Sequence, residues 1–133
     1  MNLVLRGLGI FVTTVLAWYA IQQIAAESGE VVVLLTIGAD AKDQQTRLWI
    51  VDHEDSQWLR SGSDIQSWYG NILEDPQVEM LRGTERRLYT AVPSVESREA
   101  INGLMLAKYG WADNYIGFFF SRENSIPLRL DPR

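Results

Sequence analysis

The chain has 133 residues, 47% of them hydrophobic, and a formal net charge of -5, which allows one ordinary domain but not two independent cores. It contains no cysteine, which excludes disulfides, thiolate catalysis, iron–sulfur clusters and cysteine-ligated zinc. The acidic balance disfavours binding of nucleic acid through a broad basic face. We therefore expect a single packed domain with no nucleic-acid partner.

An uncharged, apolar segment lies near the start of the chain. Residues 7–26 contain no charged side chain, and as a helix they would extend about 30 Å, the thickness of a bilayer's hydrocarbon core. Arg6 precedes the segment and Glu27 follows it, so the positive-inside rule favours a domain outside the cytoplasm. We expect a single-pass membrane anchor and hinge over residues 1–28 and a domain over residues 29–133. A cleaved signal peptide and a packed or interfacial helix are the alternatives.

The next stretch predicts three strands joined by turns. Residues 31–37 form a continuous apolar, β-branched run, as expected for a strand buried on both faces. Residues 38–45 are polar and turn-forming, and strands resume at residues 47–51 and 57–61 with a turn at residues 52–56. This pattern predicts an antiparallel meander.

A helix is expected after the third strand. Ser63 or Asp64 can cap it, and apolar residues then recur at the spacing of one helix face. Asp75 and Pro76 end it. The apolar residues are Ile65, Trp68, Tyr69, Ile72 and Leu73.

The second half of the chain predicts a hairpin, a helix and a closing strand. The helix covers residues 97–109 and ends at Gly110, and residues 111–120 are aromatic-rich and partly helical. The strands are expected at residues 77–81, 85–92 and 126–130. The whole pattern favours a mainly β (α+β) fold, a six-stranded antiparallel barrel with peripheral helices preceded by an apolar helix.

Common catalytic motifs are missing from the sequence. It has no G-x-G-x-x-G, no Walker loop and no G-x-S-x-G. The only histidine, His53, lies in an acidic turn that could ligate a divalent metal, although a solvated turn explains it equally well. Catalytic zinc usually needs three side-chain ligands, so we expect no metal site. A lone histidine also disfavours a Ser-His-Asp triad.

Residues 60–63, Arg-Ser-Gly-Ser, are the stronger candidate for a site. Here a strand ends in small hydroxyl-bearing residues and leads into a helix, whose N-terminal amides and dipole favour a phosphate. Arg60 adds a mobile cation, and Arg47 could converge on the same anion if the strands are neighbours. Plain N-capping and arginines that extend along the surface are the alternatives.

Aromatic residues are abundant. Trp49, Trp58 and Trp68 could stack on a flat cofactor ring, although filling of the core is the commoner use. Residues 118–120, three phenylalanines, could line a substrate pocket, enter the bilayer near the anchor or close the barrel.

One passage is specific enough to suggest a family. The segment from Trp68 to Val78 reads aromatic-x-x-Asn-(Ile/Leu)-x-x-x-Pro-x-Val. With segments 35–38, 46–51 and 58–62 it resembles the split β-barrel flavin and deazaflavin oxidoreductases. The likeness is greatest to the deazaflavin-dependent nitroreductase-like branch of the pyridoxamine phosphate oxidase-like group, and it covers most of the chain after the hinge.

The resemblance implies a six-stranded split barrel, often dimeric, that holds FMN or a deazaflavin in a groove. It implies hydride transfer between this cofactor and a small acceptor such as a quinone or nitro compound, the chemistry being the cofactor's own. The implied substrate-pocket residues are Lys108, Tyr109 and Tyr115. The implied cofactor-binding residues are Arg47, Trp49, Arg60, Ser61, Gly62, Ser63, Trp68 and Asn71.

The loop over residues 38–47 departs from the family pattern. The usual loop is basic, of the type Gly-Arg-Lys-Ser-Gly-x-x-Arg, and grips the cofactor phosphate. Here Arg47 is retained, but Asp40 and Asp43 stand where cations are expected and would repel an anionic deazaflavin tail. Three options follow: FMN in place of deazaflavin, a different ligand, or no redox cofactor. The alternative function is a non-catalytic barrel that binds a small ligand or a protein partner at the membrane.

Overall fold

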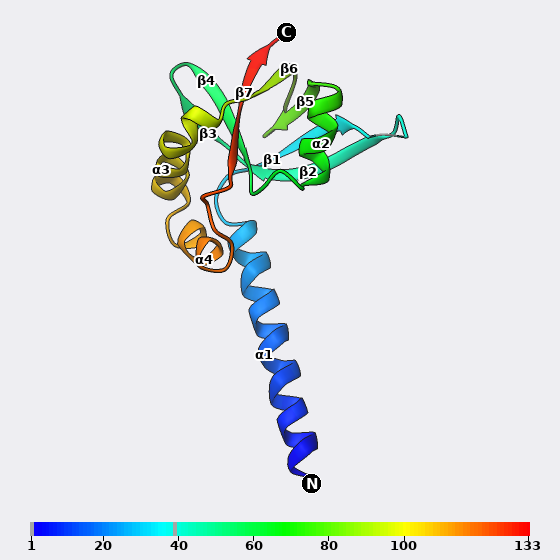
Figure 1. The fold of residues 1–133 in the computed structure, drawn as a ribbon, viewed down its shortest axis with the longest axis vertical. Coiled ribbons are helices and arrows are strands. Elements are labelled where there is room, and N and C mark those ends of the chain that lie inside the picture. The colour runs from blue at the N-terminus through cyan, green and yellow to red at the C-terminus, as the bar shows by residue number, and fades with distance from the viewer. Residues whose placement is uncertain (1, 39) are drawn as a thin grey trace.

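The computed structural model describes residues 2–38 and 40–133, so residue 39 of the expected 38–45 loop lies outside the described residues (Figure 1). Its helices are α1 (Leu3–Ala26), α2 (Ser67–Glu74), the short 3-10 helix η1 (Val95–Ser97), α3 (Arg98–Tyr109) and α4 (Trp111–Phe119). Its strands are β1 (Val31–Ile37), β2 (Asp43–Trp49), β3 (Val51–His53), β4 (Ser56–Ser61), β5 (Gln77–Arg82), β6 (Glu85–Pro93) and β7 (Ile126–Pro132).

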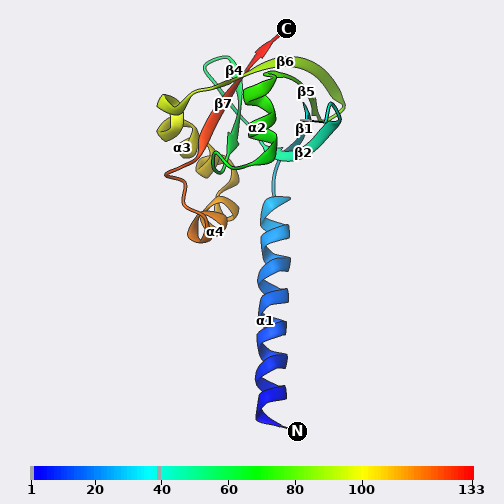
Figure 2. The same ribbon diagram turned by 45° about the vertical axis from the view of Figure 1, so that its right-hand side comes forward.

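In the described part of the chain, seven strands form one antiparallel sheet in the order β2-β1-β5-β6-β7-β4-β3. The two edge strands, β2 and β3, are separated in sequence by the single residue Ile50. Because one residue joins both edges, the sheet must curl back on itself, and Figure 2 shows the resulting half-barrel. The predicted split-barrel fold with peripheral helices is therefore confirmed.

The strand count differs from the prediction at this corner. The expected strand at residues 47–51 is divided, because β2 ends at Trp49 and β3 begins at Val51. The backbone groups of Ile50 leave the sheet and bond to α3: its N–H donates to the Tyr109 hydroxyl (2.9 Å), and its carbonyl accepts from Lys108 Nζ (2.8 Å). These two side chains stabilise a bend that the apolar sequence pattern does not reveal.

Strand β1 is buried on one face only, which corrects the expectation of burial on both. Val32, Leu34 and Thr36 are buried, and the residues between them are half-buried. A half-barrel has a single interior, so its strands alternate between core and outer surface. The core residues under this face include Leu59, Ile72, Met80, Leu128 and Leu130.

Helix α2 begins at Ser67, later than the expected cap at Ser63 or Asp64. The hydroxyl of Ser61 donates to the backbone carbonyl of Ser63 (2.6 Å) and holds a turn at this place. Trp68, Tyr69 and Ile72 face the core as predicted, whereas Ile65 and Leu73 are exposed. The amphipathic pattern was therefore right for the centre of the helix and wrong for its two ends.

The last helices and strand agree closely with the pattern. Helix α3 packs on the corner between β3 and β4, where Ile101, Met105 and Tyr109 form a second core cluster with Val51 and Trp58. The aromatic segment after it is a full helix, α4, and β7 closes the sheet between β6 and β4.

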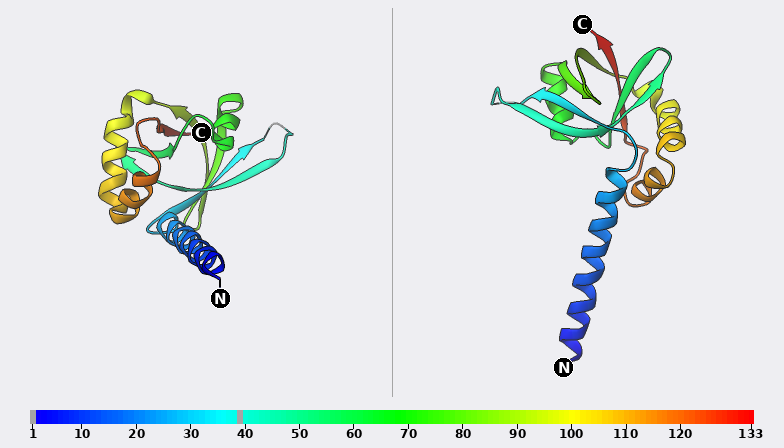
Figure 3. Two further views of the ribbon diagram at one scale, coloured as in Figure 1. Left: turned by 60° about the horizontal axis from the view of Figure 1, so that its bottom comes forward. Right: turned by 180° about the vertical axis from the view of Figure 1, so that it is seen from behind.

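Helix α1 extends away from the half-barrel, and its apolar side chains are largely exposed (Figure 3). By length and composition it could cross a membrane. Its last turns contact the domain: Ala25 is buried, and the Trp18 ring meets the Phe119 ring of α4 edge-on, with centroids 5.5 Å apart. Both views in Figure 3 show α4 beside this end of α1.

Candidate functional site

A groove lies where the half-barrel meets the end of α1. Its inner pocket has a volume of about 170 Å³ and adjoins a second pocket of about 530 Å³, with Gly62, Ile116 and Arg122 lining both. Strands β2 and β4 and the segment after α4 supply most of its walls. We call this the basal groove and define it by Arg47, Trp49, Arg60, Gly62 and Arg122.

Two arginines of the basal groove share one carboxylate. Arg60 donates to Asp113 Oδ1 at 2.7 Å, and Arg122 donates to the same oxygen at 2.9 Å. The side chains of Arg60 and Asp113 are only 5% and 7% exposed, so these charges interact with little screening by water. One carboxylate cannot neutralise two guanidinium groups. The inner end of the groove therefore carries an uncompensated positive charge.

Arg122 also has an unpaired donor. Its Nε is buried and has no hydrogen-bond partner among residues 2–38 and 40–133. Burial lowers the pKa of Arg122, and the like charge of Arg60 lowers it further. A buried donor beside a second cation favours an anionic group, because an anion would accept a hydrogen bond and would also neutralise the excess positive charge.

Arg60 was expected to be a mobile cation, but in the structure its side chain is held in place. Its guanidinium is buried and also donates to Asn102 Oδ1 at 3.2 Å. Burial beneath α3 and α4 fixes the side chain in place. Arg60 thus supplies a fixed positive charge to the wall of the groove.

Helix α1 contributes the opposite wall through its last residues. Glu27 forms a two-pronged ion pair with Arg47, with distances of 2.8 and 2.6 Å, and this bond lowers the pKa of Glu27. The indole N–H of Trp49 donates to the carbonyl of Ala26 at 2.8 Å. The cation that the sequence assigned to a phosphate is thus held by a carboxylate of the chain itself.

The segment after β4 provides the small residues of the groove. Gly62 lines both pockets, and a Cβ atom added to it would meet nothing within 4 Å. Ser63 lines the second pocket. Ser61 is buried, and its hydroxyl is used within the turn, where it donates to Ser63.

The other residues expected to bind cofactor or substrate lie elsewhere. Trp68 is part of the core, and Asn71 donates to Thr36 and Gln44, at 3.1 and 2.8 Å. The Tyr115 ring meets that of Phe119 on α4 at 5.4 Å. The structure thus brings Arg47, Trp49, Arg60 and Gly62 together, with Ser63 next to them, but not Trp68 and Asn71.

Lys108 and Tyr109 belong to a polar cluster at the Ile50 corner. Lys108 Nζ lies 2.7 Å from Glu30, and Arg82 binds both Glu30 and Asp52. Hydrogen bonds from Arg82 and Lys108 lower the pKa of Glu30 to about 2. The Tyr109 ring stacks on Trp49 with centroids 4.2 Å apart and planes 6° from parallel, so Tyr109 lies behind the groove wall.

Sequence reasoning missed Glu27, Asp113 and Arg122. For Asp113 a signal existed, because it is the only charged residue of an aromatic-rich segment, and an acidic residue in such a segment is usually paired when it is buried. Nothing in the local sequence of Glu27 or Arg122 indicates a site, since their partners are distant in sequence. His53 lies 3.7 Å from Glu54, and within the described ranges no cluster of three potential metal ligands occurs.

Comparison with known families gives one match. The model of a family described as F420H(2)-dependent quinone reductase matches residues 20–127, from the end of α1 to the start of β7. A search of curated proteins finds no match.

Several solved structures share the fold. A conserved hypothetical protein of Mycobacterium tuberculosis has a TM-score of 0.61 at 18% identity, over 86% of this chain and 79% of that one. An F420-H2 dependent reductase has a TM-score of 0.57 at 24% identity, over 74% and 92%. A third structure, described as a domain-swapped dimer, has a TM-score of 0.58 at 23% identity, over 74% and 78%. At these identities the likeness establishes the fold.

Proposed function

Because the chain belongs to the F420H2-dependent quinone reductase family, we propose that it binds the deazaflavin F420 in the basal groove and reduces a small acceptor such as a quinone. The cofactor supplies the transferred hydride when bound. The family supports a deazaflavin and does not support FMN. The observation that carries the choice of site is the single carboxylate, Asp113, shared by Arg60 and Arg122.

The residues of the basal groove fit the anionic part of such a cofactor. Arg122 lines both pockets of the groove, and the two guanidinium groups that share Asp113 have one positive charge in excess. Gly62 leaves room for close approach to the backbone. In this proposal Arg60 and Arg122 hold the anionic group, and Trp49 forms a flat wall beside it.

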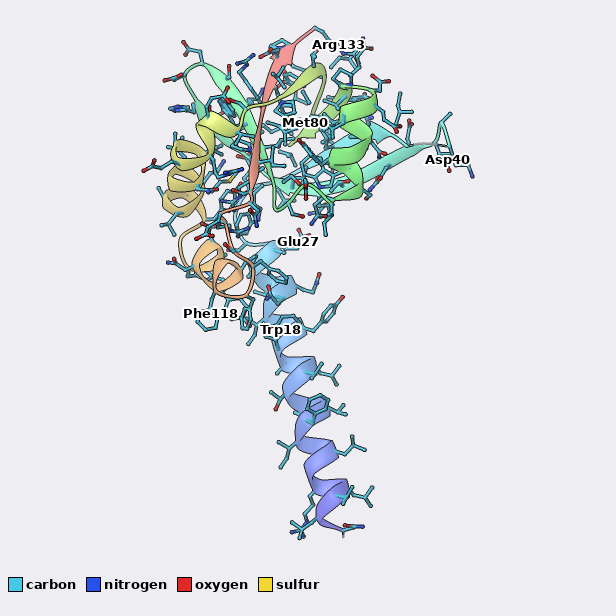
Figure 4. All side chains as sticks on the ribbon, in the orientation of Figure 1. Trp18, Glu27, Asp40, Met80, Phe118 and Arg133 are labelled. Atoms are coloured by element: carbon cyan, nitrogen blue, oxygen red, sulfur yellow. The ribbon has the colours of Figure 1, made fainter. Side chains whose placement is uncertain are left out.

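The aspartates that put a deazaflavin in doubt lie away from this groove. Figure 4 shows Asp40 at the tip of the β1–β2 hairpin, on the opposite side of the molecule from α4, with Glu27 between them at the end of α1. Asp43, at the start of β2, pairs with Ile37 at the same tip. Their repulsion of a ligand held by Arg60 and Arg122 would be weakened by distance and by salt.

We also propose that α1 and the hinge, residues 1–28, anchor the domain in a membrane. The length of α1 matches the bilayer, and its apolar surface is exposed. Lipid-soluble quinones reside in the bilayer, so an anchored reductase would stay near its acceptor. A homodimer remains an expectation, supported by the domain-swapped dimer that shares the fold.

Titration of the purified full chain with F420 and with FMN tests the cofactor assignment. We expect saturable binding of F420, and turnover of a quinone when F420H2 is supplied. Arg122→Gln should weaken F420 binding about tenfold or more, because a charge-assisted hydrogen bond contributes about 1.5–3 kcal/mol. Arg86→Gln is the matched control, since Arg86 pairs with Glu79 on the outer surface of the sheet.

The melting temperatures of both variants show whether a loss of affinity follows from a loss of fold. Failure of the folded wild-type chain to bind F420 would contradict the proposed function and favour the non-catalytic alternative. Equal affinity in Arg122→Gln and Arg86→Gln would remove the basal groove from the assignment.

A further inference from the structure

The outward face of α4 is aromatic. Trp111, Tyr115 and Phe118 recur at the i, i+4 and i+7 spacing of one helix face. Phe118 is 84% exposed, an unusual position for a phenylalanine in a packed domain. We call this exposed surface the α4 aromatic patch, and its members are Trp111, Phe118, Phe119 and Phe120.

The charge of α4 lies on the opposite side of the helix. Asp113 is buried against Arg60 and Arg122 and takes no part in the outward face. The outward face therefore offers aromatic surface without an ionic group. The exposed rings of Phe118 and Phe119 contact one another, with centroids 5.1 Å apart, and such contiguous apolar surface marks contact with another protein or with a membrane.

The position of the patch relative to α1 favours the membrane. Phe119 contacts Trp18, and Figure 4 shows Phe118 at the level of Trp18, below Glu27 along the helix. From Trp18 to Ala26 the helix rises about 12 Å. If the uncharged residues 7–26 match the hydrocarbon core, Trp18 lies about 12 Å inside its border on the domain side, at a depth occupied by acyl chains.

We propose that the α4 aromatic patch enters the acyl-chain region of the bilayer that α1 crosses, on the domain side. This inference rests on the proposed membrane anchor. A phenylalanine ring has no polar group and is stabilised among acyl chains, whereas the indole N–H of Trp111 can lie at the level of the headgroups. The members of the patch carry no charge, so their contact with lipid does not require anionic headgroups.

The contact determines how the basal groove faces the membrane. Phe119 and Phe120 line the 530 Å³ pocket together with Ser63 and Arg122. When these phenylalanines touch lipid, the pocket opens at the membrane surface. An acceptor dissolved in the bilayer then reaches the groove without crossing bulk water.

The absence of cysteine from the sequence permits a direct test by site-directed spin labelling. The full chain is reconstituted in phosphatidylcholine vesicles with one nitroxide label at Leu16→Cys, Phe118→Cys or Arg133→Cys. Leu16 lies at the middle of the uncharged segment of α1, and Arg133 lies at the far end of the barrel from α1 (Figure 1). Electron paramagnetic resonance then measures the accessibility of each label to oxygen, which concentrates in lipid, and to a water-soluble nickel chelate.

We expect the labels at positions 16 and 118 to have an oxygen-to-nickel accessibility ratio several-fold above that at position 133. The result should be the same when anionic lipid is added. Phe118 is exposed, so its replacement leaves the core intact.

Each contrary outcome has a separate meaning. A high ratio at position 16 with a low ratio at 118 overturns the membrane contact of the patch and leaves the anchor standing. A low ratio at position 16 overturns the anchor. Protection of position 118 from both reagents, with dipolar broadening between labels, overturns the proposal in favour of a second copy covering the patch.

Discussion

The backbone N–H of Ile50 donates a 2.9 Å hydrogen bond to the hydroxyl of Tyr109, at the residue where the chain passes from one edge of the sheet to the other. The hydroxyl in turn donates to the carbonyl of Glu30 at 2.6 Å. One side chain of α3 therefore joins the barrel corner to the start of β1. The corner is a structural requirement of this curled sheet, because Ile50 cannot pair with another strand.

Tyr109→Phe is expected to destabilise the domain by about 1–3 kcal/mol, since it leaves the buried N–H of Ile50 without a partner. Chemical denaturation of the variant and the wild type measures the difference. Tyr115→Phe is the matched control, because Tyr115 is half-buried on α4 and its ring contact with Phe119 does not involve the hydroxyl. Equal losses in the two variants would contradict the role of the Ile50 contact.

Glu27→Gln is expected to strengthen binding of an anionic ligand in the basal groove. Glu27 now neutralises Arg47, and its removal would free that cation. Solvent screens an exposed ion pair strongly, so affinity for F420 should rise by only a few-fold. Fluorescence titration measures the dissociation constant.

The control for this change is Glu85→Gln, because Glu85 pairs with Arg87 at 2.6 Å in a pocket that shares no lining residue with the basal groove. We expect no change of affinity there. An unchanged or weaker affinity in Glu27→Gln would place Arg47 outside the ligand site.

Much of the fold follows from local patterns of residues. An apolar, β-branched run located β1, the turns that bound them located β4 and β6, and the positions of Trp68 and Ile72 identified the core face of α2. The corner at Ile50 could not be predicted, because its sequence is as apolar as the strands beside it. Its free backbone groups are bound by side chains 58 and 59 residues away.

Of the candidate site, too, only a part could be predicted from the sequence. Arg47 and Arg60 could be found because they lie on adjacent predicted strand ends, and the curl of the sheet brings both to one groove. Asp113 and Arg122 determine the charge of that groove, yet they come from α4 and the segment after it. Pairing between such distant side chains depends on packing of helices, which no spacing rule describes.

The carboxylate of Glu30 is expected to make stability depend on acid pH. Its folded pKa is lowered to about 2 from an ordinary value of 4.5 by Arg82 and Lys108. Its contribution is therefore fully present above about pH 4.5 and is lost as the pH falls toward 2. Urea unfolding of the wild type and Glu30→Gln at several pH values measures this.

The difference in unfolding free energy between these two chains should be largest at neutral pH and should shrink below about pH 4.5. Asp52 and Glu27 also have lowered pKa values, so the wild type itself weakens in acid for more than one reason. The difference between the wild type and Glu30→Gln isolates the contribution of Glu30 to the unfolding free energy. A difference that stays constant from pH 7 to pH 3 would show that the ion cluster does not contribute through the charge of Glu30.

The turn between β3 and β4 contains a removable strain. Glu54 and Asp55 both have positive φ, 50° and 62°, in a two-residue hairpin turn. Turns of this geometry favour Asn-Gly, because side chains other than those of glycine and asparagine are crowded in the left-handed region. The double substitution Glu54→Asn and Asp55→Gly is expected to stabilise the domain by about 0.5–1 kcal/mol, after allowance for the greater unfolded-state entropy of glycine.

Thermal unfolding measures this change as a rise of a few degrees in Tm. Gly83→Ala introduces the cost of a left-handed backbone instead of removing it. Gly83 has φ of 61° in the β5–β6 turn, and an added Cβ would meet no other atom. Its Tm should fall, because the only cost there is the left-handed backbone. If the double substitution lowered Tm while Gly83→Ala also lowered it, the side chains of Glu54 and Asp55 would have to stabilise the turn by more than their backbone strain costs.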